Sequence, residues 1–222
     1  MRYRDVGTAV GSVEGVDLVV EVVAGEYKPQ DRNKNGLETS WGTYGQINFK
    51  GNPSFQPTLR FSFMKAGTNT LHNIASFKWT FLDMDVRCAS SSQSGCRNNY
   101  NNGAGSTAEQ IRISNTEFSE FYLHNGNANG LKTYNPGQQS SSYSDIDMSV
   151  SGGVTSWTGT IGERTNPSNP DTLDGNQKRV TLGLKFENKA SFEATFEVQG
   201  PNNFGRNIFF TTNSGVVTDS CA

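Results

Sequence analysis

Apolar residues, many of them β-branched or aromatic, alternate with polar residues over most of the chain, and runs of Gly, Asn and Ser separate the alternating segments. Alternation with a period of two places one face of a β-strand in a core and the other in solvent. About a dozen strands of this kind are too many for one flat sheet. We therefore predict an all-β, two-layer antiparallel β-sandwich. The clearest predicted buried faces are Val16, Leu18, Val20 and Val22; Leu59, Phe61 and Phe63; Phe77, Trp79 and Phe81; Val180, Leu182, Leu184 and Phe186; and Phe192, Ala194, Phe196 and Val198.

Helical and irregular segments are few. The stretch 169–178 (NPDTLDGNQK) predicts a helix of one or two turns, which Pro170 or Asp171 could begin. Two polar stretches, 28–42 and 87–108, predict long loops. Loops of this length in compact domains are commonly functional or become ordered against a partner. A plain surface excursion explains them equally well.

A heptapeptide, Ala-Ser-Phe-x-x-Thr-Phe, occurs at 75–81 and again at 190–196. Each copy follows a related strand, TLRFSFM at 58–64 or VTLGLKF at 180–186. Self-similarity in a conserved order is the signature of a duplicated unit. We infer an internal duplication with approximate two-fold symmetry, and chance similarity among strands of low diversity is the alternative.

Two weaker sequence similarities suggest where the two halves lie. They pair VDLVV at 16–20 with IDMSV at 146–150, and Trp41 with Trp157. On this basis residues 1–222 form a single β-rich domain with halves at about 1–100 and 140–222. Between them we predict an irregular insertion at about 87–140.

A duplicated sandwich would carry similar sheet edges facing opposite ways. Contacts that do not close on themselves propagate into sheets or filaments. We therefore predict a structural protein that self-associates through strand edges or through its long loops. It would need no cofactor, and we expect no enzymatic activity.

The charge balance limits the possible partners. The 222 residues contain 19 Lys and Arg against 21 Asp and Glu, a net charge of −2, and no basic run. Nucleic acid is therefore not an expected partner. No apolar run is long enough to cross a bilayer, so no membrane partner is expected either. The first residues, MRYRDVGTAV, lack the apolar region of a signal peptide, which fits a cytosolic protein or a mature form whose targeting segment has been removed.

Three cysteines, Cys88, Cys96 and Cys221, are an odd number and are not spaced as zinc ligands. Cys88 and Cys96 flank a polar loop and could form a local disulfide. The alternative is that both are ordinary thiols in a reducing compartment.

Two aspartates end the strand FKWTFLDMD (77–85). If the alternation continues, Asp83 and Asp85 follow Phe81 on the same face, and two carboxylates cannot enter a dry core without partners. We expect them beyond the core rim, either as a hard-cation site or as a solvated strand end facing Arg87 or another base. Arg206 could form a bidentate salt bridge with a carboxylate of this chain or of a neighbour.

The segment DRNKNGLETSWG (31–42) matches the first half of a calcium-binding EF-hand loop, but Gly42 stands where the bidentate Glu is needed. An Asx-rich turn is one interpretation. The other is a weak calcium site held by Asp31, Asn33, Asn35 and Glu38.

No catalytic constellation is visible. There are only two histidines, His72 and His124, and no G-x-S-x-G motif. Glu193 and Glu197 lie on the predicted solvent face of their strand. We therefore predict no catalytic, cofactor-binding or metal-binding residues. An alternative function is a carbohydrate- or calcium-binding surface module that uses exposed aromatic residues, with Trp41, Tyr44, Tyr100 and Trp157 as the candidates.

The segments NPSNPDTLDGNQKRVTLGLKFENKASFEATFEV, GRNIFF and FKWTFLDMD resemble a β-rich module of diatoms, other marine algae and some bacterial surface proteins. Within this group the chain is similar to the diatom pyrenoid shell (PyShell) family. That resemblance implies a chloroplast protein, without its transit peptide, that assembles laterally into a sheet or tube around the Rubisco-rich pyrenoid and limits CO2 leakage. Its partners would be further copies of itself and, indirectly, the Rubisco matrix. The surface-protein members imply instead an extracellular adhesion or sugar-binding module.

Overall fold

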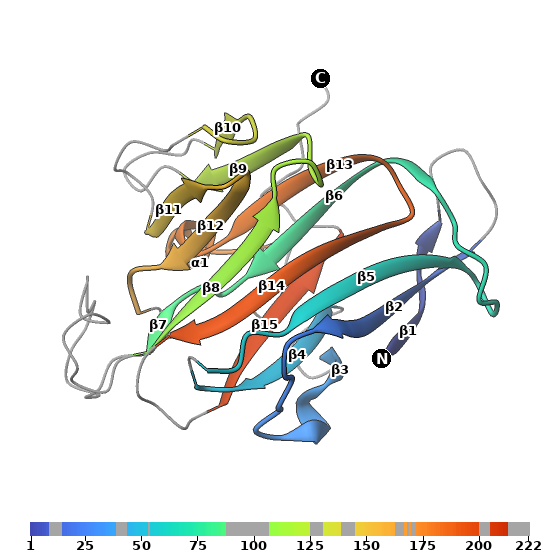
Figure 1. The fold of residues 1–222 in the computed structure, drawn as a ribbon, viewed down its shortest axis with the longest axis horizontal. Coiled ribbons are helices and arrows are strands. Elements are labelled where there is room, and N and C mark those ends of the chain that lie inside the picture. Colours follow the sequence, from blue (N-terminus) through green and yellow to red (C-terminus); the bar gives the residue numbers. More distant parts are fainter. Residues whose placement is uncertain are drawn as a thin grey trace.

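The computed structural model describes residues 1–8, 15–38, 44–52, 54–87, 107–124, 131–138, 145–162, 167, 169, 172–199 and 205–212. Two antiparallel sheets pack face to face (Figure 1), which confirms the predicted two-layer sandwich. In spatial order, sheet 1 consists of β1 (Arg2–Thr8), β2 (Gly15–Ala24), β5 (Thr58–Lys65), β14 (Ser191–Gln199), β8 (Thr107–Ser114), β12 (Val154–Gly159) and β11 (Ile146–Ser151), with β7 (Val86–Arg87) also paired to β8. Sheet 2 consists of β10 (Leu131–Tyr134), β9 (Glu120–His124), β13 (Leu182–Lys189), β6 (Ile74–Leu82), β15 (Gly205–Thr211), β4 (Tyr44–Lys50) and β3 (Gly36–Glu38).

The main core fills the space between the two sheets with aromatic and branched side chains, including Phe61, Trp79 and Phe192. The alternating patterns place these residues correctly, because each strand buries one face only. Val22 is an exception to the prediction, since it is 47% exposed. The pairing of β2 with β5 shifts register between Val22 and Ala24, so the alternation ends there.

The two sheets have the same arrangement of strands, so each position in sheet 1 has an equivalent position in sheet 2. The equivalent positions are β1 and β10, β2 and β9, β5 and β13, β14 and β6, β8 and β15, β12 and β4, and β11 and β3. The strands from β1 to β8, leaving out β7, form a first series, and the strands from β9 to β15 form a second. Both series occupy equivalent positions in the same order along the chain, except that the first two strands of the second series are interchanged. This is the arrangement that a duplicated unit related by an approximate two-fold axis produces.

The repeated heptapeptides occupy equivalent places in this scheme, on β6 in sheet 2 and β14 in sheet 1. Phe192 pairs with Phe61 across sheet 1, and Phe77 pairs with Phe186 across sheet 2. Both pairs stack with ring centroids 4.9 Å apart, at interplanar angles of 8° and 9°. Strand order and local packing therefore agree.

The positions of the repeats differ from the predicted halves. The first series of strands ends with β8 at Ser114 and the second begins with β9 at Glu120. The predicted irregular insertion at 87–140 therefore needs correction, because β8, β9 and β10 lie within it. The predicted correspondence between 16–20 and 146–150 is also wrong, since β2 and β11 are not equivalent strands. Trp41 lies outside the described residues.

The predicted loops and helix change in detail. Within 28–42 the chain forms a 3-10 turn, η1 (Arg32–Lys34), and the short strand β3. Of the loop predicted at 87–108, residues 88–106 lie outside the described residues, while Arg87 ends β7 and Thr107 begins β8.

The helix, α1 (Gly175–Arg179), begins later than predicted. Asp174 rather than Pro170 or Asp171 caps it, because the Asp174 side chain accepts hydrogen bonds from two backbone N–H groups and Gln177 reciprocates in a capping box. None of the helices in the described ranges is long and apolar enough to span a membrane.

Candidate functional site

A cluster of buried charged groups, which includes the fully buried Glu109, lies between the two sheets. Arg206 on β15 of sheet 2 donates from Nε to Oε1 of Glu109 on β8 of sheet 1, at 2.7 Å. Its Nη2 pairs with Oδ1 of Asp85, in the segment between β6 and β7. The side chains of Arg206, Asp85 and Glu109 are 14%, 8% and 1% exposed. The prediction that Arg206 pairs with a carboxylate is confirmed and both partners lie within the chain, but the guanidinium contacts one oxygen of each of two carboxylates rather than both oxygens of one.

Asp83 and Asp85 do not continue the face of Phe81, as the sequence predicted. Asp83 has a left-handed backbone, with φ of 61°, which interrupts the alternation. Met84, rather than Asp83, therefore packs in the main core. Both aspartates are buried rather than beyond the core rim, at 8% and 5% exposed.

Burial has the largest effect on the pKa values of the Arg206 cluster. Burial raises the pKa of the Glu109 carboxyl well above its ordinary value, and the negative charge of Asp83 raises it further. Burial also lowers the pKa of the Arg206 guanidinium, an effect that Asp83 opposes. One guanidinium thus serves two carboxylates, and among the described residues Oε2 of Glu109 has no hydrogen-bond partner.

The cation interpretation of Asp83 and Asp85 gains no support from the geometry. In the part of the chain that the structure describes, no group of three or more His, Cys, Asp or Glu side chains could hold a metal ion. The cluster instead joins the two sheets, because its members come from sheet 1, sheet 2 and the segment that connects them.

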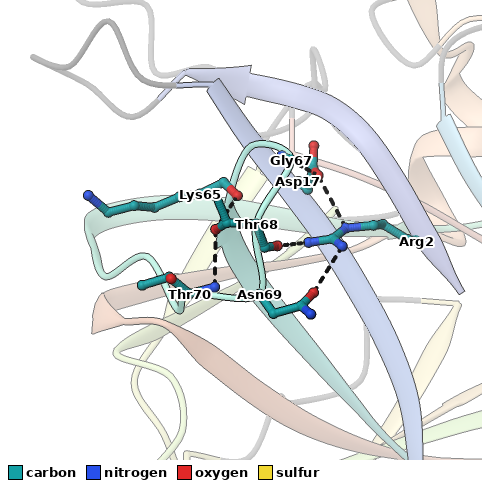
Figure 2. Close-up of polar contacts among 7 residues, drawn as sticks. All are labelled: Arg2, Asp17, Lys65, Gly67, Thr68, Asn69 and Thr70. Atoms are coloured by element: carbon teal, nitrogen blue, oxygen red, sulfur yellow. Dashed lines mark hydrogen bonds and ion pairs between the residues drawn. The ribbon is translucent and has the colours of Figure 1, made fainter.

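A second charged cluster fastens the N-terminal edge of sheet 1 (Figure 2). Nε of Arg2 on β1 lies 3.2 Å from Oδ2 of the buried Asp17 on β2. The same guanidinium donates to Oδ1 of Asn69, at 3.1 Å, and to the carbonyl of Thr68. Gly67 N–H donates to Asp17 as well, at 3.0 Å. The cluster therefore ties β1, β2 and the turn after β5 together, and no motif in the sequence signalled it.

The calcium-loop candidates form a turn. Oδ1 of Asp31 accepts from the backbone N–H of Asn33, at 3.0 Å. Oδ1 of Asn35 accepts from the Tyr27 hydroxyl at 3.0 Å and from the Asn48 N–H at 2.8 Å. These oxygens accept hydrogen bonds from protein donors, as in an Asx-rich turn, and the calcium site stays an untested alternative. The Glu38 side chain lies outside the described part of the structure.

Two of the four aromatic residues suggested for sugar binding are buried. Trp157 is 0% and Tyr44 is 1% exposed, so the prediction that they form exposed platforms is wrong. Trp157 faces the main core from the middle of β12. Tyr44 packs with Leu173 in a second apolar cluster, and its hydroxyl donates to the carbonyl of Pro167. Trp41 and Tyr100 lie outside the described residues, as do Cys88, Cys96 and Cys221.

The two histidines lie on different elements. His72 lies between β5 and β6, where its backbone N–H donates to the Phe63 carbonyl at 2.8 Å, whereas His124 ends β9 in sheet 2. The fold does not assemble them into one catalytic group.

The carboxylates predicted on the solvent face of β14 have different surroundings. Glu193 is 41% exposed and pairs with Arg60 at 2.7 Å, as predicted. Glu197 is only 11% exposed and lies 3.6 Å from Arg112. Burial raises the pKa of the Glu197 carboxyl, and Arg112 opposes that shift.

An open groove of about 590 Å³ lies on the outer side of sheet 1, beside the turn between β13 and β14. Its charged lining is largely paired, with Arg60 on Glu193 at 2.7 Å and Lys189 on Glu117 at 3.1 Å. Leu71, 55% exposed, adds an apolar surface. The groove therefore offers both polar and apolar contacts, but its opposite charges largely neutralise each other.

Among the described strands, neither sheet closes on itself, and four strands lie at sheet ends. They are β1 and β11 in sheet 1 and β10 and β3 in sheet 2. Exchange of the sheets relates β1 to β10 and β11 to β3. Each kind of edge is thus present twice.

Comparison with known proteins gives little similarity. No protein-family model matches the chain, and no curated protein matches it. Among solved structures, the N-terminal domain of the Streptococcus gordonii adhesin Sgo0707 is similar, with a TM-score of 0.49 and 12% sequence identity. The similarity covers 96% of this chain but 46% of that one, so this chain spans less than half of that structure. A likeness at this level does not extend to function.

Proposed function

We propose that this chain is a structural protein that self-associates laterally into a sheet or tube. The observation that supports the proposal is the exchange relation between the two sheets. It gives each molecule two sets of equivalent terminal strands, in opposite layers of the sandwich. Terminal strands present backbone donors and acceptors that another strand can use.

The two-fold relation explains why assembly would continue beyond a pair. A contact made by one edge of a molecule leaves its equivalent edge available on the other layer. Contacts that do not close into a ring propagate. A sandwich with related edges on both layers can therefore extend in the plane of a sheet.

The charged clusters suit a rigid building block rather than a catalyst. Arg206 and its carboxylates join the two sheets, and Arg2 with Asp17 fixes an edge strand. The polar groups of both clusters make contacts within the molecule. We accordingly propose a non-enzymatic role without a cofactor.

The resemblance to pyrenoid shell proteins supports a more specific version of this proposal. In that version the mature protein works in the chloroplast and surrounds the Rubisco-rich pyrenoid. Fluorescent tagging of the complete precursor in an algal cell tests it. A signal that forms a closed layer around the pyrenoid supports the proposal, and an extracellular signal contradicts it.

Self-association is tested by sedimentation velocity over a wide concentration range. We expect the purified chain to form large species whose share grows with concentration. Deleting 90–106, within the predicted loop, separates the two possible contacts. A deletion variant that still assembles indicates edges, and one that stays a folded monomer indicates the loop. A full-length chain that remains monomeric at the highest concentration contradicts the proposal.

The open groove supports a second candidate function, a glycan-binding surface module. Arg60 and Glu193 offer a donor and an acceptor side by side, and Leu71 offers an apolar contact, which are the kinds of group that sugar sites combine. A glycan array tests this candidate, with Arg60→Ala as the matched variant. Binding that the variant loses would favour it over the structural role.

A further inference from the structure

Strand β11 lies at one end of sheet 1, next to β12 (Figure 1). All six of its residues pair with β12 in one unbroken register, from Ile146 opposite Gly159 to Ser151 opposite Val154. Gly152 and Gly153 connect the strands, with φ of 57° and 76°. Two central residues with positive φ form a type I′ hairpin turn, which matches the twist of regular strands.

The hairpin determines which backbone groups of β11 point away from β12. In a two-residue hairpin the pair that closes the turn, Ser151 and Val154, is hydrogen-bonded, and such pairs alternate along the ladder. The Thr160 N–H donates to the Asp145 carbonyl at 2.9 Å, which shows that Asp145 and Thr160 belong to the same alternating set of hydrogen-bonded pairs. The backbone groups of Met148 and Val150 therefore point toward the outer side of β11.

The other terminal strands carry features that weaken pairing, so β11 is the edge expected to pair first. The pairing of β1 with β2 shifts register between Tyr3 and Gly7, and β1 is clamped by Arg2. Strand β10 has four residues and β3 has three. Bulges, charges and short length make a sheet edge pair less readily with other molecules. In contrast, β11 is regular and carries Asp147 as its only charge.

We propose that β11 pairs antiparallel with β11 of a second copy, with Ser149 opposite Ser149, so that sheet 1 continues from one molecule into the next. This inference rests on the proposed self-association and names its first contact. In this register the outward backbone groups of Met148 meet those of Val150 of the second copy, which forms two hydrogen-bonded pairs.

The side chains are compatible with the same register. Asp147 lies opposite Ser151 of the second copy, so no like charges oppose each other. Met148 and Val150 are half-buried on the core side, and Met148 already packs against the main core. Across the new pair they would cover each other, which removes apolar surface from water.

Disulfide trapping tests the register. Ser149 would form a non-hydrogen-bonded pair with its copy, and Cα atoms in such pairs are about 4.5 Å apart, within the range that a disulfide spans. We expect Ser149→Cys in the full chain to give a covalent dimer under mild oxidation, with a 149–149 link identified by mass spectrometry.

Asp147→Cys is the matched control, because it is exposed on the same face of the same strand. In the proposed register its two copies are separated by about four residues, or roughly 13 Å, too far for a disulfide. The native cysteines are the same in both variants, so the difference between them reports on β11. We also expect Ser149→Lys to weaken dimer formation several-fold, since it places like charges opposite each other.

The outcomes separate this inference from the function it rests on. Assembly of the wild type together with a 149–149 link, and without a 147–147 link, supports it. Assembly without a 149–149 link, or with equal linking at both positions, overturns the β11 contact and leaves self-association standing. A wild type that stays monomeric overturns both.

Discussion

Phe186 and Phe192 stack with ring centroids 4.3 Å apart, although one belongs to sheet 2 and the other to sheet 1. Each ring also stacks on the phenylalanine of its neighbouring strand, Phe77 or Phe61, at 4.9 Å in both cases. The four rings form a stacked column in the order Phe61, Phe192, Phe186 and Phe77. Exchange of the sheets relates Phe61 to Phe186 and Phe192 to Phe77, so the two 4.9 Å stacks are equivalent and the contact between Phe186 and Phe192 joins them.

This column predicts matched effects of equivalent substitutions. Phe61→Ala and Phe186→Ala, at equivalent positions of β5 and β13, should each reduce the free energy of unfolding by about 3–5 kcal/mol, because each leaves a large cavity in a fully buried site. Urea denaturation measures both values. Glu193→Ala is the control, since its side chain is exposed and should change stability by less than about 1 kcal/mol. A nearly neutral result for either phenylalanine would contradict the equivalence.

Arg206 should be more important for stability than any exposed arginine. Arg206→Met leaves Glu109 and Asp85 buried without a cation, and breaking a buried ion pair in this way costs about 3–5 kcal/mol. Arg60→Met removes an exposed ion pair and should cost at most about 1 kcal/mol. Thermal and urea unfolding of the two variants measure the difference. Equal losses would show that the Arg206 cluster does not hold the sheets together.

The raised pKa of Glu109 predicts how stability depends on pH. Because its carboxyl has a higher pKa in the folded chain than its ordinary value of 4.5, the folded state binds the proton more tightly than the unfolded state. The contribution of this group is fully present below the ordinary value and is lost as pH rises through the raised pKa.

Glu109→Gln isolates that contribution. We expect the variant to lose less stability than the wild type as pH rises above the ordinary carboxyl pKa, because glutamine does not titrate. Unfolding free energies at a series of pH values measure the difference. Glu197 titrates with the same sign and remains in both proteins, so it cancels. Identical pH profiles would contradict a buried, titrating Glu109.

Gly159 tests how closely β12 approaches the segment that carries the two aspartates. A Cβ at Gly159 would lie 2.4 Å from the Met84 carbonyl oxygen, a backbone atom that cannot turn aside. Gly159→Ala should therefore lower the melting temperature markedly. Gly175→Ala is the control, because a Cβ there meets nothing within 4 Å and alanine suits a helix better than glycine. A tolerated Gly159→Ala would mean that this approach is not close.

The sequence predicted the parts of this fold that depend on local pattern. Alternation identified the buried faces of β5, β6 and β14, and the repeated heptapeptide indicated two equivalent strands. Because both signals depend on neighbouring residues, they needed no knowledge of the tertiary structure. The similarity between the sequences of β2 and β11 misled the placement of the halves, since short alternating segments resemble one another wherever they lie.

The charged sites could not be predicted in the same way. Glu109 and Arg206 are 97 positions apart, and only the pairing of whole strands brings them together. The left-handed backbone at Asp83 interrupts the alternation at one residue, and the presence of an aspartate there is not enough to predict that conformation. Trp157 was predicted to be exposed because an aromatic residue on an alternating strand fits either face until its neighbours are known.

Lateral self-association is the central claim, and negative-stain electron microscopy of the purified full-length chain tests it most directly. The images should be recorded over a range of protein concentrations. The account predicts extended sheets or tubes whose repeat matches a single molecule or a pair of molecules. A field of separate particles of monomer size at every concentration would contradict it.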